Sequence, residues 1–447
     1  MGFARTYSVA LVGLRGHIVE VEADVSSALP SFVLLGLPDT ALNESKERVR
    51  SAAKNSGIGL TQHRLTINLT PATLPKKGSG FDVAMVVAAL QAEKKLKPSG
   101  DCVFLGEVGL DGSIRPIPGI LPAVKAAADA GHSRVVVPAQ NMHEAALIPG
   151  IQVSGFRCLA EIFVALGASA ENLKYPPESV REQPTAEIPE HGIPSDMSDV
   201  AGQAQGRFAL EIAAAGGHHL LFTGPPGSGK TMLAERLPGI LPPLDDDAAM
   251  EVTAIRSLTA GGTPLRELVR TPPFEAPHHS ASAPAILGGG SGIPRPGCVS
   301  KAHRGVLFLD EAPEFKRTVL DSLRQPLENG EIVLDRSAAS ATYPARFQLI
   351  LAANPCPCGM NVGTGTECTC TPRERRGYFG KLSGPLLDRI DLNLSVPKVS
   401  SVELASGERG EASALIRERV MTARAAQRER LGRFGLRVNA EANGKIL

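Results

Sequence analysis

The sequence predicts an α/β fold with more than one domain, and three of its features support this prediction. A glycine-rich turn at residues 224–231 lies between an apolar run and a segment of helical spacing, the strand–turn–helix order of a nucleotide-binding domain. A segment rich in Pro, Glu and Ser at residues 175–198 is unsuited to helix or core and indicates a linker. Strand-like and helical patterns alternate before this segment. A chain of 447 residues is long enough for two or three domains.

The N-terminal part carries an α/β pattern of its own. Apolar and polar residues alternate over Ser8–Glu22, Arg64–Leu69 is strand-like, and Asp82–Ala92 and Ile120–Ala130 have helical spacing. The expected parts are an α/β domain over residues 1–170, a linker over 171–198, a nucleotide-binding domain over 199–400 and a C-terminal helical segment over 401–447.

Composition limits where the protein acts and what it binds. No apolar stretch is long enough to cross a bilayer, and the N-terminus lacks the apolar region of a secretory signal, so we expect a cytoplasmic protein without membrane contacts. The net charge of +1 gives no general electrostatic attraction to nucleic acid, so such binding needs local basic patches. Trp is absent and aromatic residues make up only 4%, which argues against base-stacking platforms.

The glycine-rich turn has the sequence of a P-loop. In that motif the backbone N–H groups point at phosphates from a helix N-terminus, Lys230 reaches the β and γ phosphates, and the Thr231 hydroxyl ligates Mg²⁺. The predicted nucleotide-binding residues are Gly224, Pro225, Pro226, Gly227, Ser228, Gly229, Lys230, Thr231 and Met232, together with Asp310.

Two further strands end in polar residues suited to the same site. The apolar run Val306–Leu309 leads into Asp310 and Glu311, the pattern of a Walker B strand, in which the first carboxylate holds the Mg²⁺ shell and the second activates water. Asn354 follows the buried strand Phe347–Ala353 and is placed to orient the attacking water. The alternative for Asn354 is an ordinary turn residue.

Arg389 lies in a short motif next to apolar residues. A guanidinium there is suited to complete the active site of a neighbouring subunit. The alternative is a salt bridge with Asp388 or Asp391.

Four of the seven cysteines form a cluster with C-x-C spacing at both ends. Cys102, Cys158 and Cys298 are isolated, whereas the cluster consists of Cys356, Cys358, Cys368 and Cys370. In a cytosolic chain, four thiols that close a glycine-rich loop favour a structural zinc site over disulfides. Unpaired thiols without metal are the alternative.

Residues 200–400 resemble the AAA+ ATPases of the magnesium-chelatase type, and the whole chain resembles their ComM/YifB subgroup. The matching motifs are Val200–Gln203, the 224–231 loop, Ala276–His279, Arg295–Gly297, Ala302–Gly305, Val306–Glu311, Asn354–Cys358 and Leu382–Arg389. The resemblance implies binding of ATP and Mg²⁺, and a homo-hexameric ring with active sites between subunits. In that ring, Arg389 acts on the ATP of the neighbouring subunit.

The N-terminal domain resembles the Lon-protease fold, which is of the ribosomal S5 domain 2 type, through Phe104–Gly112 and Arg115–Gly119. A Lon-type protease requires a Ser nucleophile and a Lys base. By motif, the serine position falls on Gly80 and the lysine position on Pro122, so the resemblance implies the fold without proteolysis. A displaced Ser79 and Lys125 pair is the alternative.

Two segments of the second domain have roles that the sequence leaves open. Residues 277–292, which include His278 and His279, resemble an insertion of the chelatase group that projects from the ring. The two histidines fit metal ligands or buried hydrogen-bond donors equally. Residues 331–343 predict a strand–turn–strand similar to a pore hairpin, with Arg336 at its tip. Arg336 is placed either to contact a phosphate backbone or to lie solvated in a turn.

Arginines recur with helical spacing towards the C-terminus. They are Arg417, Arg419, Arg424, Arg428, Arg430 and Arg433. A solvated helical face is their ordinary explanation. The resemblance implies that this helix begins a lid over the nucleotide, and because the sequence ends at Leu447 before a second lid helix, we expect a partial lid.

These features together predict an ATP-hydrolysing ring motor. The family resemblance implies that it works on single-stranded or branched DNA, by branch migration or helicase activity in recombination and natural transformation. A chelatase-like or chaperone-like ATPase that remodels a protein partner is the alternative.

Overall fold

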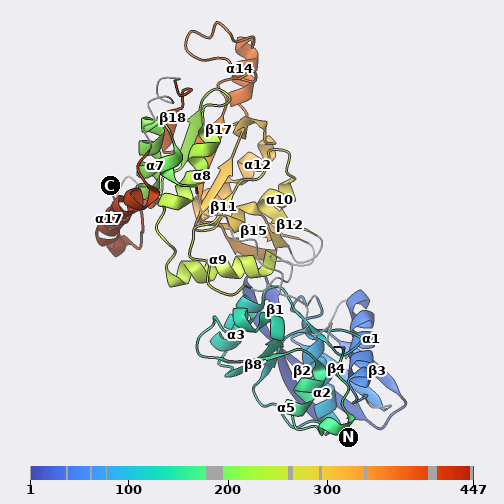
Figure 1. The fold of residues 1–447 in the computed structure, drawn as a ribbon. Helices are drawn as coiled ribbons and strands as arrows, with labels where there is room; N and C mark the ends of the chain where they lie inside the picture. The colour runs from blue at the N-terminus through green and yellow to red at the C-terminus, as the bar shows by residue number, and fades with distance from the viewer. Residues whose placement is uncertain are drawn as a thin grey trace.

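A computed structural model describes most of the chain as two lobes (Figure 1). It covers residues 2–36, 39–60, 63–76, 78–177, 195–259, 265–290, 294–336, 340–400, 410–442 and 446, with the backbone alone for 39–43. The N-terminal lobe comprises the described residues up to 177, and the C-terminal lobe those from 195 onwards. Residues 178–194 of the expected linker and 401–409 of the expected lid lie outside the described residues.

A mixed seven-stranded sheet organises the N-terminal lobe. Its elements are β1 (Gly2–Val12), β2 (Arg15–Ser26), β3 (Ser31–Leu35), α1 (Asp39–Asn55), β4 (Arg64–Thr70), α2 (Asp82–Ala92), β5 (Val103–Phe104), β6 (Glu107–Val108), β7 (Ile114–Arg115), α3 (Ile120–Asp129), β8 (Arg134–Pro138), α4 (Met142–Ala145), β9 (Gln152–Phe156) and α5 (Leu159–Ala165). The strand order is β3-β4-β2-β1-β5-β8-β9. The alternating segment Ser8–Glu22 belongs to two antiparallel strands, because the chain turns back between Val12 and Arg15.

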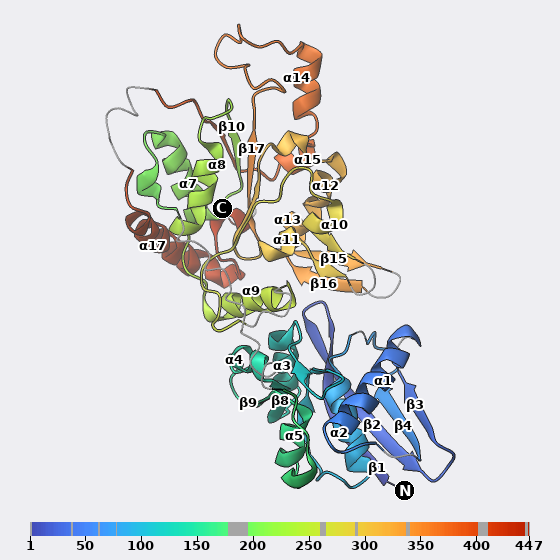
Figure 2. The ribbon, with the colours of Figure 1, turned by 45° about the vertical axis from the view of Figure 1, so that its right-hand side comes forward.

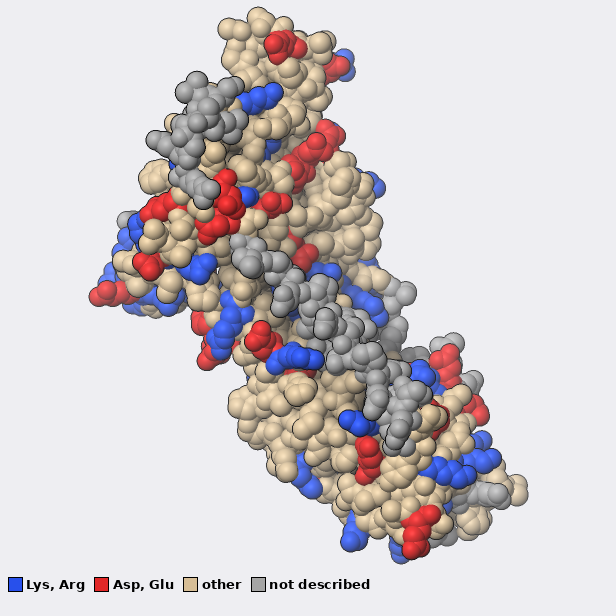
Figure 3. All heavy atoms as spheres, viewed as in Figure 1, with Lys and Arg blue, Asp and Glu red and all other residues tan. Residues whose placement is uncertain are grey.

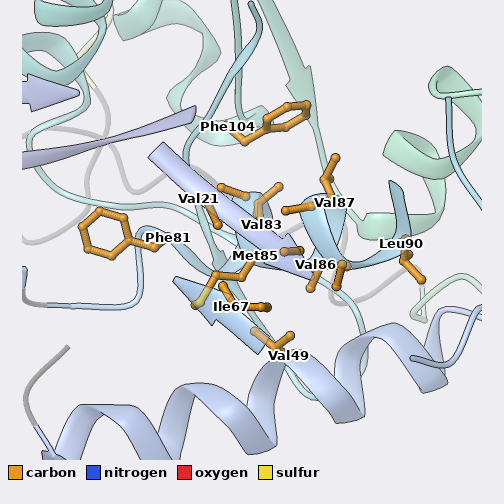
Figure 4. Packing of buried hydrophobic residues seen from close by; sticks show 14 of the residues in the cluster. Val21, Val49, Ile67, Phe81, Val83, Met85, Val86, Val87, Leu90 and Phe104 are labelled. Carbon is orange, nitrogen blue, oxygen red and sulfur yellow. The ribbon is translucent and has the colours of Figure 1, made fainter. Parts of the chain in front are cut away.

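Helix α2 is the central core element of this lobe. Every residue of the helix is buried, and it packs against β1 and β2. Figure 4 shows its Val83, Met85 and Val87 among side chains of β2, β4 and α1. Since a helix buried on all sides needs apolar residues throughout, the sequence Val-Ala-Met-Val-Val-Ala-Ala-Leu suits this position.

A parallel five-stranded sheet organises the C-terminal lobe. The elements of this lobe are α7 (Ala204–Gly216), β10 (Leu220–Thr223), α8 (Lys230–Ile240), α9 (Asp246–Thr259), β11 (Phe274–Glu275), α10 (Ala283–Leu287), β12 (Gly288–Gly289), β13 (Arg295–Pro296), α11 (Cys298–Lys301), β14 (Val306–Leu309), α12 (Arg317–Ser322), α13 (Arg324–Asn329), β15 (Glu331–Asp335), β16 (Ser340–Pro344), β17 (Gln348–Ala353), α14 (Pro372–Phe379), α15 (Gly384–Leu387), β18 (Leu392–Ser395) and α17 (Ser413–Leu431). The strand order is β11-β14-β17-β10-β18.

The two faces of this sheet bury separate apolar clusters. Leu220, Phe222 and Phe308 pack on the face covered by α7, α8 and α17, whereas Leu221 and Leu307 pack on the opposite face. This alternation along buried strands gives a three-layer lobe, with the carboxyl ends of the parallel strands at one edge. Those ends carry the predicted P-loop and Walker B residues.

The segment at residues 277–292 does not project from the lobe over its described part. Helix α10 lies within it, and Ile286 is fully buried in the apolar cluster beneath β14 and β17. The described part of this segment therefore supplies core contacts within one chain, and its projection from a ring stays a prediction. The part that extends farthest from the lobe in Figures 1 and 2 is the loop and helix α14 after β17.

Helix α17 is attached to the lobe through some of its arginines. Arg417 donates to the carbonyl of Gly239 and Arg424 to that of Ala214, at the C-terminal ends of α8 and α7. Arg419 forms ion pairs with Glu211 and Glu411. A solvated face is thus the wrong interpretation for Arg417 and Arg424, since cations at helix C-termini satisfy the last carbonyls and the helix dipole. Arg419, by contrast, is exposed on the helix surface.

The two lobes meet at helix α9 and at the turn between β1 and β2. The N–H of Gly119 donates to the Ser257 carbonyl (3.0 Å), and Met250 and Ala254 of α9 pack against the apolar cluster around α3. Leu14, at the β1–β2 turn, packs into the apolar cluster of the C-terminal lobe. In Figure 2 this turn rises towards β16.

Across the described part of the chain, no helix combines the length and apolar character needed to cross a membrane.

Candidate functional site

The glycine-rich turn connects β10 to α8 at the centre of the parallel sheet. Strand β10 lies between β17 and β18, and the Gly224 N–H donates to the carbonyl of Ala353 at the end of β17 (3.1 Å). A Cβ atom on Gly224 would lie 2.2 Å from the Val396 carbonyl oxygen, so no larger residue fits without backbone movement. Gly229 has φ of +89° immediately before α8. Glycine is therefore required at position 224 for the close approach to Val396, and at position 229 for the left-handed turn into α8.

Lys230 is buried and folded back onto the loop. Its Nζ donates to the carbonyls of Gly224 (2.7 Å) and Pro225 (3.0 Å) and to Asn354 Oδ1 (3.2 Å). Burial lowers the pKa of this ammonium group, against the raising effect of the Asp310 and Glu311 carboxylates. The sheet thus brings Lys230 and Asn354, 124 positions apart, into direct contact.

Thr231 and Asp310 are also brought together as the sequence predicts. The Thr231 hydroxyl donates to Asp310 Oδ2 at 2.7 Å, and the Glu311 N–H donates to Asp310 Oδ1 at 2.9 Å. A hydroxyl beside a carboxylate is an oxygen donor set of the kind that Mg²⁺ accepts, usually with several waters and phosphate oxygens. These two residues therefore fit the predicted Mg²⁺ site.

Glu311 has a partner that sequence reasoning did not identify. Its Oε2 lies 3.3 Å from Nδ1 of His279, and the Glu311 backbone has φ of +50°, which is uncommon for a non-glycine residue. The His279 ring lies tilted against the ring of His278 (centroid distance 4.1 Å) and meets Phe315 edge-on. His279, whose side chain is about one third exposed, is thus placed beside the carboxylate of Glu311.

Arg389 lies outside this network of described contacts. Its guanidinium donates to Glu328 Oε1 at 2.7 Å, and its side chain is about half exposed. Asp391 instead accepts hydrogen bonds from His218 and from the backbone of His219. The alternative that pairs Arg389 with Asp388 or Asp391 is therefore wrong, because Glu328 is its partner.

The four clustered cysteines converge directly after Asn354. Their Sγ atoms all lie within 4.8 Å of one another, and the Cys356–Cys358, Cys356–Cys368 and Cys358–Cys368 distances are 3.3, 3.6 and 3.8 Å. Tetrahedral zinc with Zn–S bonds of about 2.3 Å requires sulfur atoms about 3.8 Å apart. The donor set and its spacing therefore fit the predicted zinc site.

The cysteine loop also touches the P-loop. A Cβ atom on Gly359, which has φ of +77°, would lie 2.6 Å from Cδ of Pro226. A metal that fixes this loop would therefore also restrain the turn that holds the phosphates.

In the N-terminal lobe, the serine and lysine of the displaced protease pair have separate partners. Ser79 donates to the carboxylate of Glu107, whereas Lys125 forms an exposed ion pair with Asp129 one helical turn away (2.9 Å). No described contact joins Ser79 to Lys125. The absence of protease chemistry in this lobe stays a prediction.

For the cysteine cluster, we expect purified protein to contain about one Zn²⁺ per chain, and Cys356→Ser with Cys358→Ser to lose it, since two thiolates cannot hold a closed tetrahedral site. Metal analysis under reducing conditions measures the content. Replacement of the isolated Cys102 and Cys298 by Ala is the matched control and should leave zinc unchanged. Metal-free wild-type protein would contradict the zinc assignment.

For the His279 contact, we expect His279→Ala to lower kcat for ATP about 10-fold, equivalent to about 1.4 kcal/mol, while KM changes little. The reason is that Glu311 loses the neighbour that fixes its carboxylate. His279→Gln, which retains an N–H donor, should restore part of the rate. Steady-state ATPase kinetics provide the test, and a raised KM with normal kcat would assign His279 to nucleotide binding instead.

Comparison with known proteins identifies the family. The family model described as "Magnesium chelatase, subunit ChlI" matches residues 196–404, and that of "Subunit ChlI of Mg-chelatase" matches residues 21–141. All of this chain aligns with 87% of an uncharacterized protein of Mycobacterium tuberculosis at 49% identity. It aligns at 42% identity with 86% of the competence protein ComM of Haemophilus influenzae. The protein YifB of Escherichia coli is 42% identical over 96% of this chain and 83% of its own length.

A shorter similarity concerns protease sequences. The Lon protease of Mycolicibacterium smegmatis is 31% identical over 147 residues, which are 32% of this chain and 19% of that protein. This partial match agrees with the predicted Lon-like character of the N-terminal region. On the whole-chain matches, the chain belongs to the ComM/YifB family of magnesium-chelatase-like AAA+ ATPases.

Proposed function

We propose that this chain is the subunit of an ATP-driven ring motor that acts on DNA in the cytoplasm. The observation that carries the ATPase part is the convergence of Lys230, Asn354, Thr231 and Asp310 at the carboxyl ends of three adjacent parallel strands. Ligand sites in open α/β sheets lie at this edge. The family supports the same assignment, since its members are AAA+ ATPases.

In the proposed mechanism, the triphosphate of ATP lies along the backbone N–H groups of residues 224–231, at the N-terminus of α8. Lys230 exchanges the carbonyls of Gly224 and Pro225 for phosphate oxygens, which is favourable because an anionic acceptor makes a stronger hydrogen bond. Thr231 and Asp310 would hold Mg²⁺, which neutralises charge on the phosphates.

Water activation is assigned to the residues beside the phosphates. Glu311 accepts a proton from the attacking water, and Asn354 orients that water through its side-chain amide. The His279 contact at 3.3 Å restricts the Glu311 carboxylate to one region of the site before hydrolysis.

Assembly completes the proposed active site. We place Arg389 in a homo-hexamer, where its guanidinium stabilises charge on the phosphates of the neighbouring subunit. Its position outside the P-loop network of its own chain and its half-exposed side chain support this role. In the ring it would leave Glu328 for the neighbouring phosphates.

The DNA part of the proposal rests on the relative named as a competence protein and on the β15–β16 hairpin. This antiparallel hairpin is present, and Arg336 directly follows β15, with its guanidinium donating to the Asp335 carbonyl. We propose that Arg336 contacts the phosphate backbone of single-stranded or branched DNA. Hydrolysis would then drive branch migration during recombination and natural transformation.

For the ATP site, we expect Lys230→Ala to abolish tight nucleotide binding, because the cationic contact to the phosphates is lost. Glu311→Gln should bind ATP normally and hydrolyse it at least about 100-fold more slowly, because only water activation is lost. Fluorescent-nucleotide binding and phosphate release measure the two effects. Glu314→Gln, three residues on, is the control, and wild-type turnover by Glu311→Gln would refute the catalytic assignment.

For the DNA contact, we expect Arg336→Ala to weaken binding of single-stranded DNA irrespective of sequence and to reduce the slope of log affinity against log salt by about one. Basal ATPase activity should persist. Arg317→Ala, on the exposed surface of α12, is the control. If the wild type neither binds DNA at low salt nor hydrolyses ATP faster with single-stranded or branched DNA, the motor acts on a protein partner instead.

A further inference from the structure

A cavity of about 350 Å³ lies where the two lobes meet. Its walls combine the β1–β2 turn of the N-terminal lobe with three parts of the C-terminal lobe: α9, the segment before β14 and the base of the β15–β16 hairpin. On the face drawn in Figure 3, Lys and Arg side chains lie beside Asp and Glu side chains around the junction of the lobes. A volume of this order suits a ligand group of nucleotide size.

Three arginines line the cavity, and two of them lack a partner. Arg304 Nε donates to Glu251 Oε2 at 2.9 Å. Arg15 and Arg346 form no ion pair or side-chain hydrogen bond with any residue that the structure describes. Both arginines are exposed, and they line one cavity from different lobes.

Hydrogen bonds of the Arg346 backbone fix the cavity wall around this residue. The Arg346 N–H donates to Nδ1 of His303 (3.0 Å), and the Arg346 carbonyl accepts from the Arg304 N–H (2.6 Å). His303 is almost fully buried, and because its Nδ1 accepts a hydrogen bond, its Nε2 carries the proton and donates to Glu251 (2.9 Å). The Arg346 side chain lies over Gly330, where a Cβ atom would lie 2.6 Å from its Cγ.

The acidic residues of the cavity do not neutralise these arginines. Glu251 is already paired with His303 and Arg304, which lower the pKa of its carboxyl group to about 2. Glu331 is the other carboxylate in the wall and forms no ion pair with a described residue. Three guanidinium groups against two carboxylates leave a surplus of one positive charge in the cavity wall.

Forked guanidinium donors are suited to the oxygens of a phosphate group. From this cavity, we propose that the junction of the two lobes binds a phosphate of the DNA strand, held by Arg15 and Arg346. The proposal rests on DNA being the substrate of the motor. It adds a contact at the base of the β15–β16 hairpin and gives the N-terminal lobe a direct part in holding DNA.

The site exists only while the lobes are docked. Gly13 has φ of +66°, and a Cβ atom there would lie 2.9 Å from the Thr342 carbonyl oxygen of β16. The adjacent Leu14 packs into the apolar cluster of the C-terminal lobe. Glycine at position 13 therefore permits the close approach that brings Arg15 into the same cavity wall as Arg346.

The test measures binding of a labelled 30-nucleotide single strand to the full chain at several salt concentrations. Arg15→Ala with Arg346→Ala should weaken binding about 10-fold or more at 0.1 M salt and reduce the log–log salt slope by about one, since the two arginines neutralise a single phosphate. Basal ATPase activity should remain unchanged. The control, Arg50→Ala with Arg64→Ala, removes the same charge from the N-terminal lobe and should leave affinity and slope unchanged.

A second variant distinguishes a site that needs the two lobes in contact from a general effect of positive charge. Gly13→Ala keeps every charged group but disturbs the close approach, so it should weaken DNA binding in the same direction. Unchanged affinity and slope in the double arginine variant, with a wild type that binds DNA, would overturn the inference. Absence of DNA binding by the wild type would instead contradict the proposed function.

A third arm tests whether the phosphate comes from a free molecule. Inorganic pyrophosphate is added to Lys230→Ala, in which the P-loop contact is removed, and the melting temperature is followed. We expect no stabilisation at concentrations where DNA binds. Stabilisation that disappears when Arg15 and Arg346 are also replaced, without any effect of these arginines on DNA binding, would overturn DNA as the source of the phosphate.

Discussion

The parallel pairing of β14, β17 and β10 is the constraint on which the site depends. Pairing sets Leu220 beside Ile350 and Val306 beside Gln348, so all three strands end at the same edge. Asp310, Asn354 and the P-loop then emerge side by side, although they are distant in sequence. Apolar residues on both faces of these strands bury the sheet, and this burial keeps the register fixed.

Contacts outside the sheet adjust the polar residues at this edge. His279 approaches Glu311 from the segment after β11, and the cysteine loop after β17 presses Gly359 against Pro226. Both segments follow strands of the same sheet. This arrangement links the proposed zinc site and the proposed water-activating residue to one rigid framework.

The two lobes are joined through helix α9 and through the base of the β15–β16 hairpin. Helix α9 connects the region after the P-loop helix to α3, while the β1–β2 turn reaches the base of the β15–β16 hairpin. A change at the nucleotide edge can therefore reach the N-terminal lobe through packed elements with few intervening loops. In this arrangement the β1–β2 turn of the Lon-like lobe contacts the β15–β16 hairpin. Ser79 of this lobe pairs with Glu107, and Lys125 pairs with Asp129.

The sequence alone determined the two-part α/β organisation, helix α2, the P-loop, and Asp310 and Asn354 beside it. Each of these follows from local periodicity or from a short motif with fixed geometry. Tertiary structure decided the partners of His279, Arg389 and the arginines of α17, since these contacts join segments whose approach depends on how loops and layers pack. The same holds for the cavity between Arg15 and Arg346. Spacing along a chain specifies elements and the ends of strands, whereas contacts between separate lobes arise only after both have folded and docked.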